Sequence, residues 1–161
     1  MKIGSKGDYG LRALIDLAER FESGRITQAK DIAERQAIPK DYLSLIMIEL
    51  RKAGLIESTR GPTGGYRLAY KPEEITMGQA LRSLEAEVSL IDCVTELGFT
   101  QCSISLRCRM RKVWMEANSA VTAILDRTTI ADLCGPRAGT DLIQDNKTSS
   151  PDSPEGLNFN I

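Results

Sequence analysis

The fold is decided by residues 27–70, whose sequence is TQAKDIAERQAIPKDYLSLIMIELRKAGLIESTRGPTGGYRLAY. Apolar side chains recur at helical spacing in two parts of this stretch. The first part predicts a short helix with Thr27 as its N-cap, and the second predicts a helix over residues 40–53. A turn at residues 36–39 separates them, and Pro39 suits the first turn of the second helix. Two short helices joined by a tight turn are the helix-turn-helix pattern.

A β-hairpin is predicted directly after the second helix. Residues 55–59, LIEST, and residues 66–70, YRLAY, have the composition of strands. Residues 60–65, RGPTGG, connect the two strands with glycines that allow positive φ. A helix-turn-helix followed by a hairpin is a winged helix, so the sequence predicts a mainly α-helical fold with a small β-hairpin wing.

Further helices are predicted on both sides of this stretch. One covers residues 9–21 and ends before Gly24, and another follows Thr76, its predicted N-cap, as far as Leu84. The longest helical pattern covers residues 106–126, and its apolar side chains lie on one side. Such a stripe after a complete small domain favours a dimerisation helix, with a helix that packs inside its own domain as the alternative. A capping box is predicted after it, at Thr129 and the residues that follow.

These patterns divide the chain into four parts. Residues 1–84 are the predicted winged helix-turn-helix, and residues 85–108 are a cysteine-bearing loop. Residues 109–134 hold the dimerisation helix and a C-terminal turn. Residues 135–161 are rich in Gly, Pro, Ser, Asp and Asn, a composition that predicts a flexible tail.

Composition limits the class of protein. The chain of 161 residues is 42% hydrophobic and 27% charged, and no apolar run approaches the roughly 20 residues of a membrane helix. No apolar signal region follows the first residues, so we expect a cytoplasmic protein. The net charge is −1, but residues 1–80 hold 13 Lys and Arg against 11 Asp and Glu. A mildly basic head binds phosphates if its cations gather on one face. No nucleophile–base pair or cofactor loop is present, so we expect no enzymatic activity.

Three of the four cysteines, Cys93, Cys102 and Cys108, fall in one short segment of a chain without histidine. In the reducing cytoplasm such thiols are more often metal-binding or reactive than disulfide-bonded. Thiolates suit iron–sulfur clusters. Zinc is an alternative, although the C-x2-C spacing of ordinary zinc sites is absent. A thiol switch and inert thiols are further alternatives. Cys134 lies in another segment, and we expect it to be a small buried hydrophobe.

Double-stranded DNA is the expected partner of the winged helix. The helix that begins at Lys40 should enter the major groove with its N-terminal residues at the base edges. Arg60 at the root of the wing could reach the minor groove, where a narrow A·T tract attracts arginine. Gly64 lets the wing backbone approach phosphates, although a plain hairpin turn needs the same glycine. The candidate DNA contacts are therefore Thr27, Gln28, Pro39, Lys40, Tyr42, Ser44, Arg60 and Gly64. A dimer would bind two half-sites, so the operator should be pseudo-palindromic.

Several stretches together resemble one family of bacterial regulators. They are residues 5–14, SKGDYGLRAL, residues 32–38, IAERQAI, residues 50–56, LRKAGLI, and residues 60–66, RGPTGGY. With the cysteine segment, the resemblance covers residues 1–134 and is to the winged-helix regulators typified by IscR, NsrR, RirA and CymR. It implies a homodimeric repressor or activator. In most such proteins three cysteines bind a [2Fe-2S] or [4Fe-4S] cluster that senses iron, cluster supply, nitric oxide or oxygen.

The chain departs from that family at the cysteines. Eight residues separate Cys93 from Cys102, where IscR-like and NsrR-like proteins usually have fewer, whereas the five before Cys108 are usual. IscR-like proteins take a histidine three residues further on as the fourth ligand, and here that residue is Arg111. NsrR-like proteins take an N-terminal aspartate of the other subunit, and Asp8 stands in that place. The resemblance therefore implies Cys93, Cys102, Cys108 and Asp8 as ligands. The alternative for Asp8 is an exposed acid stabilised by the helix dipole.

The combined hypothesis is a dimeric DNA-binding transcriptional regulator that senses redox state, iron or nitric oxide through an iron–sulfur cluster. In this hypothesis the cysteine loop packs between the dimerisation helix and the DNA-binding head. Cluster binding or oxidation changes the conformation of the loop, and this alters the spacing or orientation of the two recognition helices. The first alternative is a cluster-free winged-helix regulator of the CymR sort, controlled by thiol oxidation or a partner protein. A second is an iron–sulfur carrier or electron-transfer protein, against which the irregular cysteine spacing and the complete winged helix argue.

Overall fold

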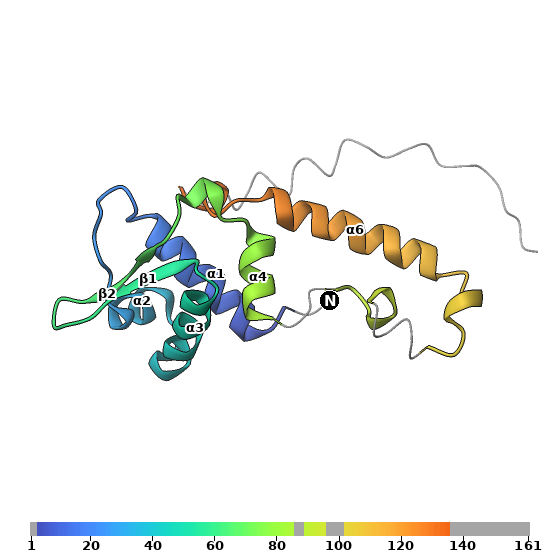
Figure 1. Ribbon diagram of the computed structural model, residues 1–161, viewed down its shortest axis with the longest axis horizontal. Coiled ribbons are helices and arrows are strands. Elements are labelled where there is room, and N and C mark those ends of the chain that lie inside the picture. The colour runs from blue at the N-terminus through green and yellow to red at the C-terminus, as the bar shows by residue number, and fades with distance from the viewer. Residues whose placement is uncertain (1–2, 86–88, 96–101, 136–161) are drawn as a thin grey trace, which may run out of the picture.

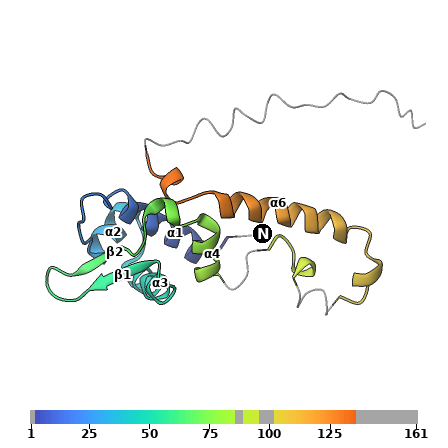
Figure 2. The ribbon, with the colours of Figure 1, turned by 45° about the horizontal axis from the view of Figure 1, so that its top comes forward.

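The computed structural model describes residues 3–85, 89–95 and 102–135. The chain forms, in order, α1 (Ser5–Ala18), α2 (Ala29–Gln36), α3 (Lys40–Lys52), β1 (Ile56–Thr59), β2 (Gly65–Leu68), η1 (Pro72–Glu74), α4 (Met77–Leu84), η2 (Asp92–Val94), η3 (Ser105–Arg107), α6 (Arg111–Arg127) and η4 (Ala131–Leu133). Helices α1 to α4 and the hairpin gather into one body, here called the head, and α6 extends away from it (Figures 1 and 2). The mainly α-helical fold with a hairpin wing is as predicted.

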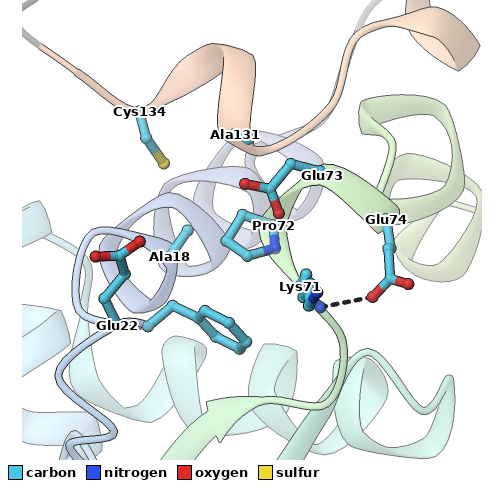
Figure 3. Close-up of a pocket in the computed structure, with 9 residues that line it drawn as sticks. Ala18, Glu22, Lys71, Pro72, Glu73, Glu74, Ala131 and Cys134 are labelled. Atoms are coloured by element: carbon cyan, nitrogen blue, oxygen red, sulfur yellow. Dashed lines mark hydrogen bonds between the residues drawn. The ribbon is translucent and has the colours of Figure 1, made fainter.

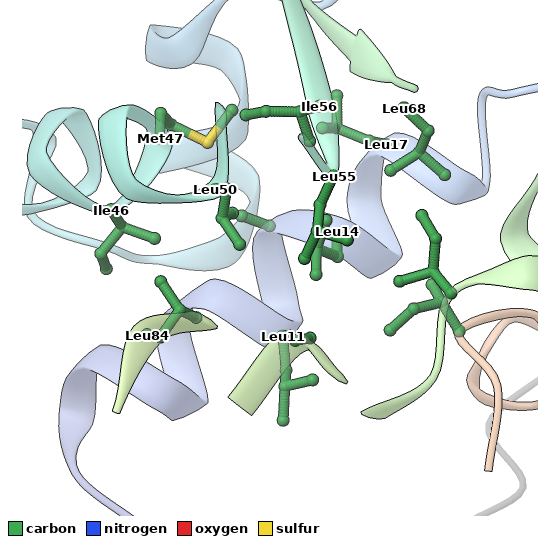
Figure 4. Close-up of a cluster of buried hydrophobic side chains, with 14 of the residues drawn as sticks. Leu11, Leu14, Leu17, Ile46, Met47, Leu50, Leu55, Ile56, Leu68 and Leu84 are labelled. Atoms are coloured by element: carbon green, nitrogen blue, oxygen red, sulfur yellow. The ribbon is translucent and has the colours of Figure 1, made fainter. Parts of the chain in front are cut away.

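Helix α1 lies at the centre of the head, because α2, α3, α4 and β2 all pack against it. Leu11, Leu14 and Leu17 project from α1 into a cluster that includes Leu50 of α3 and Leu55 (Figure 4). All five side chains are at most 8% exposed. Each buried leucine contributes about 1.5–3 kcal/mol relative to an exposed one. The core of the head is therefore aliphatic, in line with the few aromatic residues of the sequence.

Helix α1 begins and ends earlier than the predicted residues 9–21. It starts at Ser5, and after Ala18 the chain turns until Gly24, where φ is +62°. Apolar periodicity did not reveal the first turn of α1, because the residues there are polar or glycine. The gain of one turn places Asp8 on the helix.

The prediction that Thr27 caps α2 is wrong. Gln28 is the N-cap residue, and Thr27 is paired with the wing instead. The Thr27 N–H donates to the carbonyl oxygen of Tyr66 at 2.9 Å, and the Tyr66 N–H donates back at 2.8 Å. A β-branched residue suits this extended pairing. A bridge between residues so far apart in the chain has no signature in local periodicity.

The turn between α2 and α3 occurs at the predicted place. Ala37 ends α2 in the left-handed region, with φ +51° and ψ +44°. Pro39 then precedes α3, and Gly54, with φ +74°, follows it. The strands of the wing pair antiparallel, with Ile56 opposite Leu68.

A second connection between distant segments joins the end of α6 to the head. The Met77 N–H donates to the carbonyl oxygen of Thr128, and the Ile130 N–H donates to that of Ile75, both at 2.8 Å. Ile130 is fully buried as a result. Thr76 caps α4 as predicted, since its Oγ1 accepts the Gln79 N–H at 3.1 Å.

The predicted capping box after α6 is confirmed. The Thr129 N–H donates to Asp132 Oδ2 at 2.8 Å, and the Asp132 N–H donates to Thr129 Oγ1 at 3.2 Å. These reciprocal bonds open the short turn η4. The pKa of Asp132 is held below its ordinary value by the bonds that the Thr129 N–H and the Thr129 hydroxyl both donate to Asp132 Oδ2.

Helix α6 starts five residues later than predicted, because Ser105–Arg107 form the separate turn η3. Its 17 residues correspond to a length of about 25 Å. It packs against α4 and η2, but much of its apolar stripe stays uncovered. Val113 is 62% exposed and Ile124 is 50% exposed. No helix among the described residues is both long and apolar enough to cross a membrane. The predicted flexible tail lies outside the described residues, apart from Gly135.

Candidate nucleic-acid interface and cysteine segment

A hollow lies between the start of α2, one side of α3 and the wing. Its lining contains four cations and no carboxylate, namely Lys30, Lys40, Arg51 and Arg60. None of these four forms an ion pair within the described part of the chain. The hollow therefore carries concentrated positive charge, although the chain as a whole is slightly negative.

Polar contacts hold the wing against this hollow. Gln28 Nε2 donates to the carbonyl oxygen of Pro62 at 3.1 Å. Arg51 Nη1 donates to Ser58 Oγ at 3.3 Å. Together with the pairing of Thr27 and Tyr66, these bonds fix the wing relative to α2 and α3. Cations on three different elements can therefore contact one ligand at the same time.

The glycines of the wing serve two different purposes. Gly61 has a positive φ of +115°, whereas Gly64 and Gly65 do not and instead allow close backbone contacts. A Cβ at Gly65 would overlap the carbonyl oxygen of Thr27, and a Cβ at Gly64 would overlap that of Thr59. The expectation that positive φ explains all these glycines is therefore corrected. Gly65 lets the wing strand approach the segment that precedes α2.

The candidate DNA contacts differ in their access to solvent. Lys40, Pro39 and Arg60 are exposed. Ser44 is also exposed, and its Oγ donates to the carbonyl oxygen of Lys40 at 3.0 Å. Thr27 is only 6% exposed, so its side chain has little surface to offer.

Tyr42 lies on the side of α3 that faces α1. Its ring meets that of Tyr9 edge to face, with 5.8 Å between centroids. Tyr42 is partly buried by this contact. Gln28 and Gly64 are partly buried as well, and they lie beside the hollow.

Sequence reasoning missed Lys30 and Arg51. Arg51 follows Lys40 by three helical turns, so the helical periodicity of α3 could have placed the two on one side. Lys30 joins them only because Thr27 pairs with the wing, which no local pattern indicates.

A buried carboxylate anchors α2 to α1 behind this surface. Asp16 is 1% exposed and accepts hydrogen bonds from Arg35 Nε at 2.8 Å and from Arg35 Nη2 at 2.7 Å. Gln36 Nε2 donates at 3.3 Å, and Arg20 forms an ion pair at 3.3 Å. Burial alone raises the pKa of Asp16, but the hydrogen bonds from Arg35 and Gln36 and the charges of Arg20 and Arg35 hold it below its ordinary value.

The three cysteines of the predicted ligand set are free and partly exposed. Cys93 lies in η2, Cys102 begins the next described segment, and Cys108 follows η3. Figure 1 shows η2 (yellow-green) and η3 (gold) beyond the head, near α6. Among the described residues, no three Cys, Asp or Glu side chains lie close enough to hold a metal ion. Residues 96–101, between the first two cysteines, are outside the described residues.

Asp8, the fourth predicted ligand, lies on α1 in the head. Its side chain is 49% exposed and pairs with Arg12 at 2.8 Å. Within a single chain the structure does not bring Asp8 to the cysteines. The donors nevertheless suit an iron–sulfur cluster chemically, since three free and accessible thiols are soft ligands.

Cys134 has a different environment from the other three. It lines a shallow cavity with Glu73 and Ala131 at the junction of α1, η1 and η4 (Figure 3). Its Sγ donates to the carbonyl oxygen of Ile130 at 3.2 Å. Burial raises the pKa of this thiol, and the negative charges of Glu19 and Glu73 raise it further. Cys134 is thus a half-buried, protonated thiol, close to the expectation.

Among the described residues, hydrogen bonds connect the cysteine segment to both the head and α6. The Gly7 N–H at the start of α1 donates to Glu85 Oε1 at 3.0 Å, directly before residues 86–88. The Leu90 N–H donates to Asn118 Oδ1 of α6 at 2.9 Å. The segment is therefore tied to both the head and α6.

A helix-turn-helix with a wing and a cationic hollow between them defines a winged-helix DNA-binding protein. Residues 3–136 match the family Rrf2, described as iron-dependent transcriptional regulator. The chain belongs to this family.

Relatives and a solved structure agree with this assignment. The chain is 38% identical over 133 residues to the transcriptional regulator IscR of Aliivibrio salmonicida, covering 83% of this chain and 77% of that protein. It is 39% identical over 138 residues to NsrR of Geobacillus kaustophilus, covering 86% of this chain and 92% of that protein. The structure of CymR, the global cysteine regulator of B. subtilis, matches with a TM-score of 0.68 at 36% identity. The match covers 83% of this chain and 95% of the CymR chain.

These comparisons confirm the family resemblance that the sequence showed. They also confirm the winged-helix fold. The named relatives are transcriptional regulators, so the chain is a regulator and not an enzyme.

Proposed function

We propose that this regulator is a homodimer that binds a pseudo-palindromic operator in double-stranded DNA. We further propose that its DNA affinity responds to redox state, iron or nitric oxide through an iron–sulfur cluster. The cationic hollow supports the first statement most directly. Three accessible thiols on a segment joined to both the head and α6 support the second, as does the iron-dependent description of the family. We place this regulator in the cytoplasm, where DNA is accessible to it and thiols stay reduced.

In the proposed complex, the head is held on the phosphate backbone by the cations of the hollow. Lys30 and the N-terminus of α2 face one phosphate strand, where positive charge is favourable. Arg51 and Lys40 contact the backbone beside the major groove. Each cation that neutralises a phosphate makes the slope of log affinity against log salt more negative by about 0.9.

Direct contacts in this proposal come from the exposed or partly exposed members of the predicted set that line or flank the hollow, which are Gln28, Pro39, Lys40, Ser44, Arg60 and Gly64. Arg60 is assigned to the minor groove beside the wing. Thr27 and Tyr42 are assigned a supporting role, because Thr27 pairs with the wing strand and Tyr42 packs on α1.

The proposed dimer is formed through α6. Apolar side chains that are exposed in one chain would be buried against a second copy, and Val113 and Ile124 lie on this stripe. Two heads joined in this way present two recognition helices, which require two half-sites.

Cys93, Cys102 and Cys108 are the proposed cluster ligands, with Asp8 of the partner chain as the fourth. An iron–sulfur cluster bound there supplies a centre that oxygen and nitric oxide can alter. The chain contributes the connections: Glu85 holds the start of α1, and Asn118 holds the segment on α6. A change in the conformation of the segment therefore acts on the recognition head and on the proposed dimer helix together.

The test is anaerobic purification followed by iron and sulfide analysis per chain. The proposal predicts matching iron and sulfide in the wild type and their loss in Cys93→Ser, Cys102→Ser and Cys108→Ser. Cys134→Ser is the matched control and should keep both. Asp8→Ala should lower iron retention without changing the fold. A colourless, iron-free wild-type protein that binds DNA would contradict the cluster.

One alternative has specific support. A cluster-free regulator fits the similarity to CymR, which is named as a cysteine regulator, and fits the separated thiols of the described chain. It predicts an iron-free protein whose operator affinity changes when a mild oxidant is added and returns with a thiol reductant.

A further inference from the structure

Two aliphatic side chains are exposed on the face of α3 that points away from the core. Leu45 is 60% exposed and Ile48 is 39% exposed. They are three residues apart, so they are neighbours on the helix surface. The opposite face of α3 is buried, through Leu43, Ile46, Met47 and Leu50. The outward face of the recognition helix thus carries a small apolar patch.

Few polar groups share this face. The Ser44 hydroxyl already donates to the carbonyl oxygen of Lys40. Asp41 bears a short acidic side chain, and Arg51 lies on the wing side of α3, where it donates to Ser58 Oγ. A helix that distinguishes bases mainly by hydrogen bonds presents long side chains such as Arg, Asn or Gln. This helix presents leucine and isoleucine at its centre instead.

We propose that Leu45 and Ile48 recognise the C5-methyl groups of thymines in the major groove. This inference rests on the proposed function, because it takes α3 as the helix that enters the groove. Thymine is the base whose major-groove edge carries a methyl group, and apolar side chains recognise it by contact. The cations of the hollow border the patch, since Arg51 follows Ile48 by less than one turn. When these cations contact phosphates, the outward face of α3 lies against base edges.

Charge favours DNA over a protein as the occupant of this patch. Lys52 extends from the same outward face, and Lys40 and Arg51 flank it on the wing side. The carboxylates at this surface are Asp41 and Glu49, and Glu49 already pairs with Lys6 at 3.3 Å. A surface with apolar side chains bordered by cations complements a groove that has methyl groups between rows of phosphates.

The experiment begins with selection of binding sites from random duplex DNA by the anaerobically purified full chain. Each thymine of the selected half-site is then replaced by uracil, which lacks only the C5-methyl group. Dissociation constants are measured by fluorescence anisotropy at one salt concentration. For each contacted thymine, the wild-type protein should bind the uracil duplex roughly four-fold more weakly. This factor corresponds to the free energy of burying one methyl group.

The variants assign the effect to residues. Leu45→Ala should bind the thymine and uracil duplexes equally at the position that Leu45 contacts, and Ile48→Ala should do so at its own position. Both side chains are exposed, so the fold should persist, and thermal unfolding checks this. Arg51→Ala is the control: it should weaken binding to both duplexes by the same factor.

Each contrary result has a distinct meaning. If both alanine variants still distinguish thymine from uracil as the wild type does, the proposal is overturned. Unchanged operator affinity in both variants also overturns it and leaves the patch to a protein partner. A selection that returns no preferred sequence would contradict the proposed function itself, and this inference with it.

Discussion

Asp16 stabilises the DNA-binding head from inside, because its two carboxylate oxygens bind Arg35 of α2 while its backbone belongs to α1. The helix-turn-helix is oriented by this buried pair. A buried ion pair that loses one partner usually costs about 3–5 kcal/mol. Arg35 and Arg20 remain partly exposed, so water can compensate part of that loss.

The first prediction concerns Asp16→Asn. At neutral pH we expect the free energy of unfolding to fall by about 2 kcal/mol, measured by urea denaturation. The folded-state pKa of Asp16 is lowered. Its stabilisation is therefore present above the ordinary carboxyl pKa and is lost as the pH falls through the lowered value. The difference between wild type and variant should shrink below about pH 4.

Asp41→Asn, at an exposed carboxylate of α3, is the matched control and should leave stability nearly unchanged. If the deficit of Asp16→Asn is the same at low and neutral pH, the ionic account of this network is wrong.

The second prediction concerns Ala37, which holds a left-handed conformation without being glycine. That conformation costs an alanine about 1 kcal/mol. Ala37→Gly should therefore raise the free energy of unfolding by about 1 kcal/mol and the Tm by a few degrees, as measured by calorimetry. Ala120→Gly, in the middle of α6, should have the opposite sign. A lower Tm for Ala37→Gly would contradict this assignment.

Among the elements, those with local signals were predictable and those made by distant pairing were not. The hydrophobic periodicity of α3, the Thr76 cap and the glycine-rich wing are local, and each occurs where the sequence predicted it. The Thr27–Tyr66 pairing and the attachment of the end of α6 to the head depend on contacts that arise only on folding. For that reason the local pattern wrongly predicts Thr27 as a cap and does not reveal Lys30.

Helix α6 carries the third prediction. If its exposed stripe is the dimer interface, Val113→Asp should convert a dimer into a folded monomer, seen by sedimentation velocity. Because Val113 is 62% exposed in the single chain, the substitution should not disturb the packing of the head. The Tm of the head should therefore be unchanged, apart from the stability that dimerisation itself adds to the wild type. Operator affinity should fall, because one head contacts one half-site. Lys112→Glu, next to the stripe, should stay dimeric. A dimeric Val113→Asp protein would place the interface elsewhere.

At the scale of the whole molecule, the sequence suggests which side chains could bind a cluster but does not show how they would assemble. The cysteine spacing pointed to Cys93, Cys102 and Cys108, and the family resemblance implied Asp8 as the fourth ligand. In the described chain Asp8 lies on the head and the cysteines lie near α6. A site built from these donors requires a second chain and the residues between Cys93 and Cys102, neither of which periodicity can describe. The proposed DNA-binding face is built from one continuous stretch, residues 28–66, so its helices and wing could be predicted from local patterns, although sequence reasoning did not assign Lys30 and Arg51 to it.

The central claim is that operator affinity follows the state of the cysteine segment. The most direct test measures the operator dissociation constant, under nitrogen and at one salt concentration, before and after a chelator removes iron from the same preparation. We predict a change of about ten-fold or more, equivalent to about 1.4 kcal/mol of coupling free energy. Cys102→Ser should show no such change. Equal dissociation constants for wild-type protein with and without matching iron and sulfide would contradict the account.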